Sequence, residues 1–381
     1  MSISLSELLV LGQGSDLASE RGVSCTGELP PASDPHLVDR AIAAKKALGS
    51  RAMILGHHYQ RDEVIQFADI TGDSFKLAQA AADQSSAEFI FFCGVHFMAE
   101  SADILTSPKQ RVILPDLAAG CSMADMATAN QVNQCWHDLE KLGVASRTVP
   151  VTYMNSSAAI KSFTGEHGGT ICTSSNAQKT LEWAFAKAEK VLFLPDQHLG
   201  RNTAVLSLGL SLEDCVLWNP WKPMGGLTED QIRGAKMILW RGHCSVHGRF
   251  TRESIQEVRT RIPGVQVIVH PECQHEVVVD SDVVGSTEKI IQTVSSAPAG
   301  SKWAIGTELN LVSRLAQNNP DKEIVFLDKT VCYCSTMNRI DLPHLVWAME
   351  SIVAGHIVNE IKVDERVAKY SKLALEQMLA L

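Results

Sequence analysis

A threefold repeat of short apolar runs and helical segments is the feature that most limits the fold of this chain. The first unit contains ILGHHYQ, ITGDSFKLAQAA, FFCGVHFMAESADIL and VILPDLAAGC, and the second contains VTYMNSSAA, ICTSSNAQKTLEWA, FLPDQHLGRN and MILWRGHC. The third contains VIVHPECQHE, VVGSTEKIIQ, WAIGTELNLV and IVFLDKTVCYC. Alternation alone is common to α/β chains, but each unit also closes with a cysteine, at Cys121, Cys244 and Cys334. We therefore interpret the chain as three copies of one α/β unit.

The spacing inside the units supports this interpretation. Each unit opens with a strand that ends in His or Tyr, and a Gly, Thr or Ser turn then begins a helix. The interval between these two points is 17 residues from His57, 21 from Tyr153 and 17 from His270. Three units built alike can pack around a common axis, which would bring cysteines that are far apart in the sequence to one centre.

Short β-rich runs predict strands over residues 52–55, 89–92, 111–114, 149–153, 191–194, 237–240, 265–269, 303–305 and 324–327. Helical windows cover 75–82, 178–188 and 287–294, and the end of the chain from 364 to 381 reads as an amphipathic helix. Strands and helices in alternation are typical of parallel sheets covered by helices. We predict an α/β fold of three similar three-layer αβα domains around a pseudo-threefold axis. The active site should be central, because ligands of open α/β sheets bind beyond the carboxyl ends of the strands.

The closing cysteines are the strongest chemical signal. A Cys-x-Cys pair, Cys332 and Cys334, allows a disulfide, a zinc corner, a redox couple or one leg of a metal cluster. Structural zinc normally takes four ligands, often in close Cys-x-x-Cys pairs, which this chain lacks. Three thiolates on an iron–sulfur cluster would leave one iron open to substrate as a Lewis acid. The remaining cysteines are interpreted as small buried apolar residues: Cys25, Cys93, Cys135, Cys172, Cys215 and Cys273.

Polar residues at the predicted strand ends suit acid–base work on an oxygen-rich anion. They are His57, Tyr59, Tyr153, Asn155, His247, His270 and Glu272. Ser74, Ser174 and Thr287 open helices, where backbone N–H groups and a hydroxyl bind carboxylate or phosphate. Plain helix capping explains the same three hydroxyls, and both roles can coexist. One ring of the His57-His58 pair can equally be a packed core histidine.

Composition excludes some partners. A net charge of −9 argues against a nucleic-acid surface and against an anionic membrane. No apolar stretch is long enough to span a bilayer. The first residues lack the basic and apolar regions of a signal peptide. We expect a cytoplasmic, reducing compartment, in which ten cysteines indicate burial, metal binding or catalysis rather than disulfides.

Many motifs in order make the chain resemble the quinolinate synthase (NadA) family over about residues 35–345. They are GHHYQ, GDS, GVHFMAESADIL, DLAAGCSMADM, VTYMNSS, CTSSNA, PDQHLG, WRGHCSVH, HPEC, VGSTE and CSTMNRI. The resemblance implies three α/β domains and condensation of iminoaspartate (iminosuccinate) with dihydroxyacetone phosphate to quinolinate, phosphate and water, in de novo NAD biosynthesis. It also implies a 4Fe–4S cluster with three cysteine ligands and one open iron. We place an extension at 1–34 and domains at 35–120, 121–243 and 244–339, with the C-terminal helices, about 340–381, packed on the first domain.

The resemblance also assigns residues. Carried over by motif, the cluster ligands are Cys121, Cys244 and Cys334, with Cys334 preferred to Cys332 because Met337 follows it at the family spacing. Iminoaspartate contacts carry over to His57, Ser74, Tyr153, Met154, Asn155, Ser174, His270, Pro271, Glu272 and Thr287, with Ser175 as the alternative to Ser174. Tyr59 and His247 match family groups that move protons. In the mechanism that we expect, His57, Tyr59, His270 and Glu272 transfer protons while the carbon–carbon bond forms and while phosphate and water leave. Donation by Glu272 requires a raised pKa, which burial provides.

Two departures and two alternatives remain open. The pair Cys332-x-Cys334 replaces the longer cysteine motif of some relatives, and His58 replaces an aromatic or amide residue. An aconitase-type hydro-lyase would also use a cluster with one iron open to substrate. An iron–sulfur carrier or sensor would hold a cluster without catalysing a reaction. We expect an L-aspartate oxidase or dehydrogenase as a possible partner, because iminoaspartate is unstable.

Overall fold

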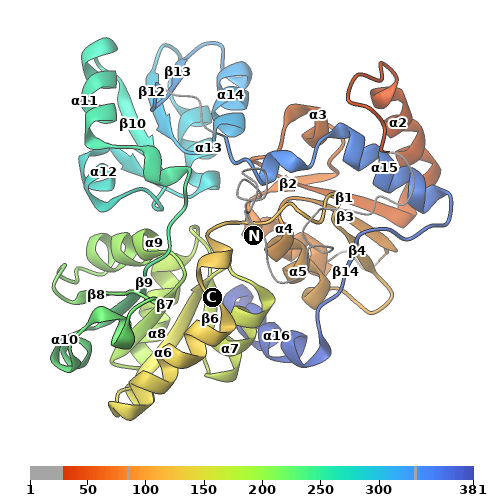
Figure 1. Ribbon diagram of the computed structural model, residues 1–381. Helices are drawn as coiled ribbons and strands as arrows, with labels where there is room; N and C mark the ends of the chain where they lie inside the picture. The colour runs from red at the N-terminus through yellow and green to blue at the C-terminus, as the bar shows by residue number, and fades with distance from the viewer. Residues whose placement is uncertain (1–28, 84–85, 330–332) are drawn as a thin grey trace, which may run out of the picture.

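Three separate sheets, each covered by helices, form three lobes in the computed structural model (Figure 1). The structure describes residues 29–83, 86–329 and 333–381. The predicted Cys25 and Cys332, and most of the extension at 1–34, therefore lie outside the described residues. The predicted α/β class is confirmed, since within each sheet the strands pair in parallel apart from one edge strand.

The first sheet has the order β14-β4-β3-β1-β2. Its strands are β1 (Ala52–His57), β2 (Ile70–Gly72), β3 (Phe89–Cys93), β4 (Arg111–Ile113) and the antiparallel edge strand β14 (Glu360–Ile361). The helices of this part of the chain are α2 (Leu37–Leu48), α3 (Asp62–Ile65), α4 (Ser74–Asp83) and α5 (His96–Leu105). All five residues of β3 are buried, as expected for a parallel strand covered on both faces.

The second sheet has the order β6-β5-β7-β9-β8 and is parallel throughout. Its strands are β5 (Thr148–Tyr153), β6 (Thr170–Cys172), β7 (Lys190–Leu194), β8 (Cys215–Trp218) and β9 (Met237–Trp240). Its helices are α6 (Ala129–Lys141), α7 (Ala158–Glu166), α8 (Ala177–Lys187), α9 (Gln197–Asn202) and α10 (Glu229–Gly234). Helix α6 begins at a capping box in which Thr128 and Gln131 satisfy each other's backbone N–H groups.

The third sheet has the order β11-β10-β12-β13. Its strands are β10 (Gln266–Val269), β11 (Val283–Val284), β12 (Lys302–Gly306) and β13 (Glu323–Phe326). Its helices are α11 (Arg252–Arg261), α12 (His275–Asp280), α13 (Thr287–Ser296) and α14 (Leu309–Asn318). The helical windows predicted at 75–82, 178–188 and 287–294 are confirmed as α4, α8 and α13.

One topology is common to the three sheets. In each, the first strand of the unit lies centrally, the second strand flanks it on one side, and the third and fourth follow on the other. The strands β8 and β14 are additions at the edges. This shared order gives the repeat in the sequence a structural counterpart, because the first strands β1, β5 and β10 occupy the same place in their sheets.

The C-terminal segment joins two lobes. Helix α15 (Leu342–Val353) packs on α2, where Arg40 bonds Glu350 through both carboxylate oxygens, and β14 extends the first sheet. Helix α16 (Glu365–Ala380) is the amphipathic helix expected at 364–381, but it lies mainly against α7 and β6 of the second unit (Figure 1). Ser371 donates a hydrogen bond to the carbonyl of Ala158, and Gly165 allows this close approach because a side chain there would meet the α16 backbone.

Candidate active site

The three closing cysteines line one cavity. Cys121, Cys244 and Cys334 follow the strands β4, β9 and β13, each on a loop beyond the carboxyl end of its strand. Each is partly exposed through the cavity and takes part in no disulfide among the described cysteines. Burial is the main cause that raises all three thiol pKa values, to about 12 for Cys121, and the neighbouring sulfurs add to the effect at Cys121 and Cys244. The three sulfurs therefore lie close enough to influence one another.

Hydrogen bonds from other units hold these loops. Asp116, in the loop before Cys121, accepts hydrogen bonds from the backbone of Ala118 and from Arg339, which follows Cys334. The Trp240 ring, at the end of β9, donates to the carbonyl of Met126. The loops that carry the thiols are thus tied directly to one another rather than only to their own sheets.

His57 and His270 have matched environments at the ends of β1 and β10. The N–H of Tyr59 donates to Nδ1 of His57 at 3.1 Å, and the N–H of Glu272 donates to Nδ1 of His270 at 3.3 Å. Burial lowers the pKa of each ring to about 3, with His58 adding to the effect at His57 and His247 at His270. Both rings are therefore neutral near pH 7, and the occupied Nδ1 assigns the proton to Nε2.

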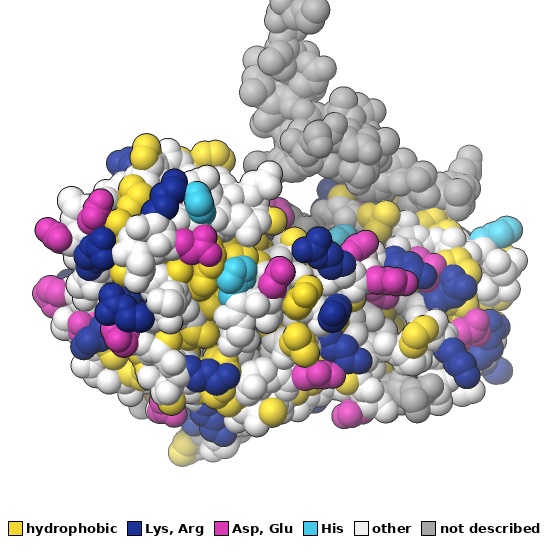
Figure 2. All heavy atoms as spheres, turned by 90° about the horizontal axis from the view of Figure 1, so that it is seen from below, with side chains coloured by type: hydrophobic (Ala, Val, Ile, Leu, Met, Phe, Trp, Pro, Cys, Tyr) yellow, Lys and Arg dark blue, Asp and Glu magenta, His cyan; other side chains and the backbone are white. Residues whose placement is uncertain are grey.

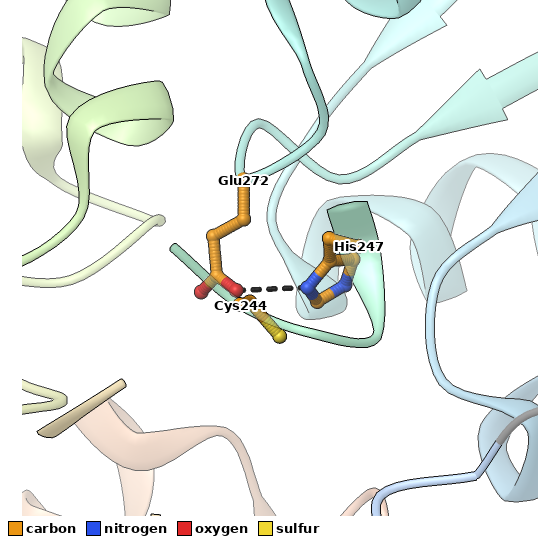
Figure 3. Close-up of side chains that lie close together, drawn as sticks. All are labelled: Cys244, His247 and Glu272. Carbon is orange, nitrogen blue, oxygen red and sulfur yellow. Dashed lines mark ion pairs between the residues drawn. The ribbon is translucent and has the colours of Figure 1, made fainter. Parts of the chain in front are cut away.

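Glu272 is the buried carboxylate at the centre of the site. Its Oε1 accepts a 2.6 Å hydrogen bond from the Tyr153 hydroxyl, and its Oε2 lies 2.8 Å from Nδ1 of His247. Figure 3 shows Glu272 and His247 facing each other beside Cys244, and donor atoms of these three lie within 4.8 Å of one another. Burial alone would raise the pKa of Glu272, but His247, His270 and the two contacts outweigh it and lower the pKa to about 2.

This direction is opposite to the raised pKa that a proton-donating Glu272 requires. The expectation considered burial alone, whereas the carboxylate is surrounded by a hydroxyl and two imidazoles that favour its charged form. Glu272 is therefore an acceptor. The adjacent Tyr153 keeps its proton, because burial and the Glu272 charge raise its pKa well above the ordinary value.

Tyr59 reaches from the first unit into the third. Its hydroxyl lies 3.0 Å from Oγ1 of Thr287 and 2.8 Å from Oγ1 of Thr307. Burial raises the Tyr59 pKa well above the ordinary value, with the Glu272 charge acting in the same direction. Tyr59 is consequently a neutral phenol with partners on both sides.

The hydroxyls predicted at helix starts all line the cavity. Ser74 is the first residue of α4 and Thr287 is the first residue of α13. Ser174 lies in the turn before α8 rather than on its first residue. The neighbouring Ser175 donates instead to Asp73 at 2.8 Å, which ties the second unit to the first. Of the two adjacent serines, Ser174 lines the cavity and Ser175 does not.

Two of the residues predicted to contact iminoaspartate, Met154 and Pro271, do not line the cavity. Met154 is buried, and its sulfur accepts a hydrogen bond from Ser101. Pro271 does not line the cavity, and its carbonyl accepts from Asn202 at 2.8 Å. Asn155 does line it, and its Oδ1 atom is buried without a hydrogen-bond partner among the described residues, as expected of a group that meets a ligand.

Several lining residues were not predicted. Asp73 and Glu308 are buried acids, and Glu308 accepts hydrogen bonds from the N–H groups of Cys334, Asn310 and Leu311. Burial raises the Glu308 pKa to about 7. Both acids stand in segments that the repeat singled out, ITGDS and WAIGTELN, but the sequence analysis assigned a role only to Ser74 in the first segment and to no residue of the second. The other unpredicted lining residues are mostly apolar: Val95, Phe97, Met98, Met123, Thr173, Val246, Thr336 and Met337.

The donor set fits a thiolate-ligated metal group. Among the described cysteines, five do not line the cavity, namely Cys93, Cys135, Cys172, Cys215 and Cys273, and all but Cys215 are fully buried. The three that line it come from three loops, so they can hold one group from three directions. Metal binding removes the protons of thiols, and the high thiol pKa values mean that loading must release protons.

One face of the molecule illustrates how its charged side chains are distributed. Lysine, arginine and acidic side chains are interspersed over the face seen in Figure 2, without a continuous basic patch. None of the helices in the described ranges combines the length and the apolar character needed to cross a bilayer.

Comparison with known proteins gives one consistent result. The family model for quinolinate synthetase A protein (NadA) matches residues 40–380. A quinolinate synthase of Streptomyces coelicolor is 69% identical over 376 residues, covering 98% of this chain and 95% of that protein. A quinolinate synthase of a Nocardioides species is 67% identical and covers 100% of this chain and 98% of that protein. A quinolinate synthase of Bacillus subtilis is 55% identical and covers 90% of this chain and 92% of that protein.

Proposed function

Because this chain belongs to the quinolinate synthetase A (NadA) family, we propose that it condenses iminoaspartate with dihydroxyacetone phosphate to give quinolinate, phosphate and water. This reaction would supply the pyridine ring for de novo NAD biosynthesis in the cytoplasm. The observation that carries the proposal is the lining of a single cavity by Cys121, Cys244 and Cys334 together with the acid–base groups His57 and Glu272.

The cofactor we propose is a 4Fe–4S cluster bound by Cys121, Cys244 and Cys334. When bound, such a cluster supplies a Lewis-acidic iron without a protein ligand. The raised thiol pKa values argue against free-thiol chemistry at this position, because an uncoordinated thiol here would stay protonated and weakly nucleophilic.

Substrate carboxylates and phosphate would be held by neutral donors. Ser74 and Thr287 offer hydroxyls and first-turn N–H groups at the starts of α4 and α13, each a helix of 10 residues. Helix starts favour anions because their N–H groups are unpaired and carry partial positive charge. The full set that we propose for iminoaspartate is His57, Ser74, Tyr153, Met154, Asn155, Ser174, His270, Pro271, Glu272 and Thr287, with Met154 and Pro271 acting through the backbone or by packing.

Proton handling would be divided among the buried rings and the carboxylate. His57 and His270 present Nε2–H, so each can donate a hydrogen bond to a substrate oxygen. Glu272 is anionic and can accept a proton or stabilise a positive charge that forms on His247. Tyr59 and Tyr153 remain phenols in the resting site and can act as donors. Proton transfer by positioned groups of this kind contributes about 10²–10⁴-fold to a rate.

The rival functions are less well supported. A carrier or sensor should present its cysteines near the outer surface, whereas these thiols face a cavity lined by buried catalytic-type groups such as His57, His270 and Glu272. A hydro-lyase would share the open iron, but the family match and the curated relatives are quinolinate synthases. An L-aspartate oxidase or dehydrogenase that supplies iminoaspartate is the partner that we propose on chemical grounds.

An anaerobic assay tests the proposal. Oxaloacetate and ammonia form iminoaspartate in solution, and the purified, reconstituted protein should convert it with dihydroxyacetone phosphate to quinolinate. Replacing Cys121, Cys244 or Cys334 by Ala should abolish both the brown colour and turnover. The matched control is Cys135→Ala, a buried cysteine that lies away from the cavity. Equal bleaching by Cys135→Ala would overturn the ligand assignment, and a coloured protein that makes no quinolinate would overturn the function.

A further inference from the structure

A buried lysine lies directly behind the cavity wall, where the first unit meets the second. Lys161 belongs to α7, is fully buried and does not line the cavity. Its ammonium group donates to the carbonyl of Ser156 at 2.5 Å and to the carbonyl of Phe97 at 3.4 Å. Phe97 lines the cavity, and Ser156 directly follows Asn155, which also lines it. The ammonium group is thus bonded to the cavity wall from behind.

The immediate surroundings of Lys161 compensate its charge only in part. Its Nζ atom lies 5.2 Å from the centroid of the Phe97 ring, a position in which the ring attracts a cation. Glu100 acts on Lys161 through its charge, but its carboxylate bonds the N–H of Ala158, and Lys161 takes part in no ion pair within the described ranges. A buried charge without a partner is costly. The lysine therefore lowers stability unless another negative charge offsets it.

The cavity provides such negative charge. Its described lining includes the acids Asp73, Glu272 and Glu308 and no lysine or arginine. The three lining cysteines add more when they bind a metal group, because thiols bind metals as thiolates. Burial lowers the pKa of Lys161 to about 8, which leaves the ammonium group charged at pH 7, and the charge of Cys121 opposes this lowering. Lys161 and Cys121 therefore lie close enough for their charges to interact.

We propose that Lys161 is a positioning residue that acts by its charge: it compensates the thiolate-bound metal group from behind the wall, so that anionic substrates can approach that group. The inference rests on the proposed function, through its 4Fe–4S cofactor. Lys161 needs no contact with substrate for this role, because a charge acts over a longer range through a buried, low-dielectric wall than through water. The same charge favours the reduced, more negative state of a cluster, since the charge around a cluster helps to set its reduction potential.

The reduction potential of the cluster measures this effect without substrate or turnover. Lys161→Met removes the charge and the N–H donors at similar length, whereas Lys161→Gln removes the charge and keeps N–H donors. In the reconstituted protein at pH 7, we expect both variants to lower the equilibrium constant for one-electron reduction about tenfold, a shift of about 59 mV. The iron content should stay at the wild-type level in both.

Lys190 offers a matched control. It is the other buried lysine of the described residues, and it also donates to two carbonyls, those of Arg233 and Ala235. It is the first residue of β7, and neither it nor its two partners line the cavity. Lys190→Met and Lys190→Gln should therefore keep the wild-type potential.

The outcomes separate charge from structure. An unchanged potential in both Lys161 variants would reject the proposal. A shift with Met but not with Gln would assign the effect to hydrogen bonds, and an equal shift in the Lys190 variants would assign it to loosened packing, so either result also rejects it. If neither neutral variant holds iron, Lys161→Arg decides, because it retains the charge: a wild-type potential supports the proposal and a lowered potential overturns it.

The proposed function is judged by a different result. A wild-type protein that holds the cluster but makes no quinolinate overturns the function, and the potentials of the Lys161 variants still decide the role of the lysine. A wild-type protein that binds no cluster after reconstitution overturns both.

Discussion

Asn202 offers a sharp test of how the site is held. It is the last residue of α9, and its side chain is buried. Its amide donates to the carbonyl of Pro271 at 2.8 Å and to the carbonyl of Cys273 at 2.9 Å, so two bonds clamp the loop on which Glu272 sits. The Oδ1 atom of Asn202 also meets Nδ1 of His275 at 2.8 Å. Replacement of Asn202 by Ala removes all three contacts.

The expected loss in the free energy of unfolding follows from counting the buried groups that lose a hydrogen-bond partner. Two carbonyl groups in the buried segment 271–273 would lose a donor, and an unpaired buried acceptor costs about 1–3 kcal/mol. Asn202→Ala should therefore lower the free energy of unfolding by about 2–6 kcal/mol. Loss of the His275 contact should add little to this destabilisation, because the half-buried ring can turn and form a hydrogen bond with water. A loosened loop should also displace Glu272 from Tyr153 and His247, and a shift of about 1 Å in a catalytic group can cost about 100-fold in rate.

The matched control is Asn319→Ala. Asn319 is also buried and donates one bond, at 2.8 Å, to the carbonyl of Leu315 at the end of α14, away from the cavity. Its Oδ1 atom accepts from Lys322, whose ammonium group also meets the Asp321 carboxylate and therefore keeps a partner in the variant. We expect a loss of about 1–3 kcal/mol there and no change in kcat. Urea denaturation gives the stabilities, and the anaerobic quinolinate assay, run well below both transitions, gives the rates.

Two results would refute this reasoning. If the two variants lose equal stability, the second clamp bond of Asn202 contributes nothing. If Asn202→Ala keeps the wild-type kcat, the loop does not need the clamp to place Glu272. Unchanged denaturation slopes in both variants would show that the comparison concerns the same unfolding reaction.

Two further predictions concern the second unit. Ser174→Ala should raise KM for iminoaspartate about 10-fold or more, since a hydrogen bond to a charged group contributes about 1.5–3 kcal/mol. Ser175→Ala should instead change the stability of the fold, because it removes the hydrogen bond to Asp73, and should leave KM within about twofold. The reverse pattern would exchange the roles of the two serines. Lys161 is fully buried, and burial lowers its pKa to about 8. Because the unfolded chain binds the proton more tightly between about pH 8 and 10.5, the free energy of unfolding should rise with pH across this window by up to about 3 kcal/mol relative to Lys161→Met. Parallel urea midpoints for the two proteins at pH 8 and 10 would contradict it.

Much of the fold follows from local pattern. Runs such as 89–92 and 191–194 are wholly apolar and β-rich, so they could be assigned without tertiary information, and both form buried central strands. The strands β2, β6 and β11 were not predicted, because two or three residues carry too little pattern. Helix α16 was predicted as a helix, but its apolar face says nothing about which lobe it covers.

The features of the site likewise divide into those that the sequence predicts and those that only the structure shows. The convergence of Cys121, Cys244 and Cys334 was expected from their equivalent slots in the repeat, and the shared cavity agrees with it. The contacts of Thr307 and Asn202 join them to partners that are 248 and 69 residues away, at Tyr59 and Pro271, and no local motif encodes such contacts.

The histidine pKa values were equally out of reach from the sequence. An imidazole titrates near pH 6.5 only when water reaches it, and burial moves both His57 and His270 to about 3. The sequence places these rings at strand ends but does not say how deeply the strands are covered. The assignment of the two rings as neutral Nε2–H donors therefore depends on the structure, through the N–H groups of Tyr59 and Glu272 that occupy Nδ1.

The charged side chains that line the cavity limit how it can hold an anionic substrate. Among the described residues that line it there is no lysine or arginine, while Asp73, Glu272 and Glu308 bring acidic groups. Under the proposed function, carboxylate and phosphate groups of the substrates would therefore be held by hydroxyls, by imidazole N–H groups and by the N-terminal turns of α4 and α13. A mobile lysine would compete for Glu272 and neutralise the carboxylate that His247 needs when it carries a proton. Fixed neutral donors would avoid this competition and leave the Glu272 carboxylate in its contacts with Tyr153 and His247.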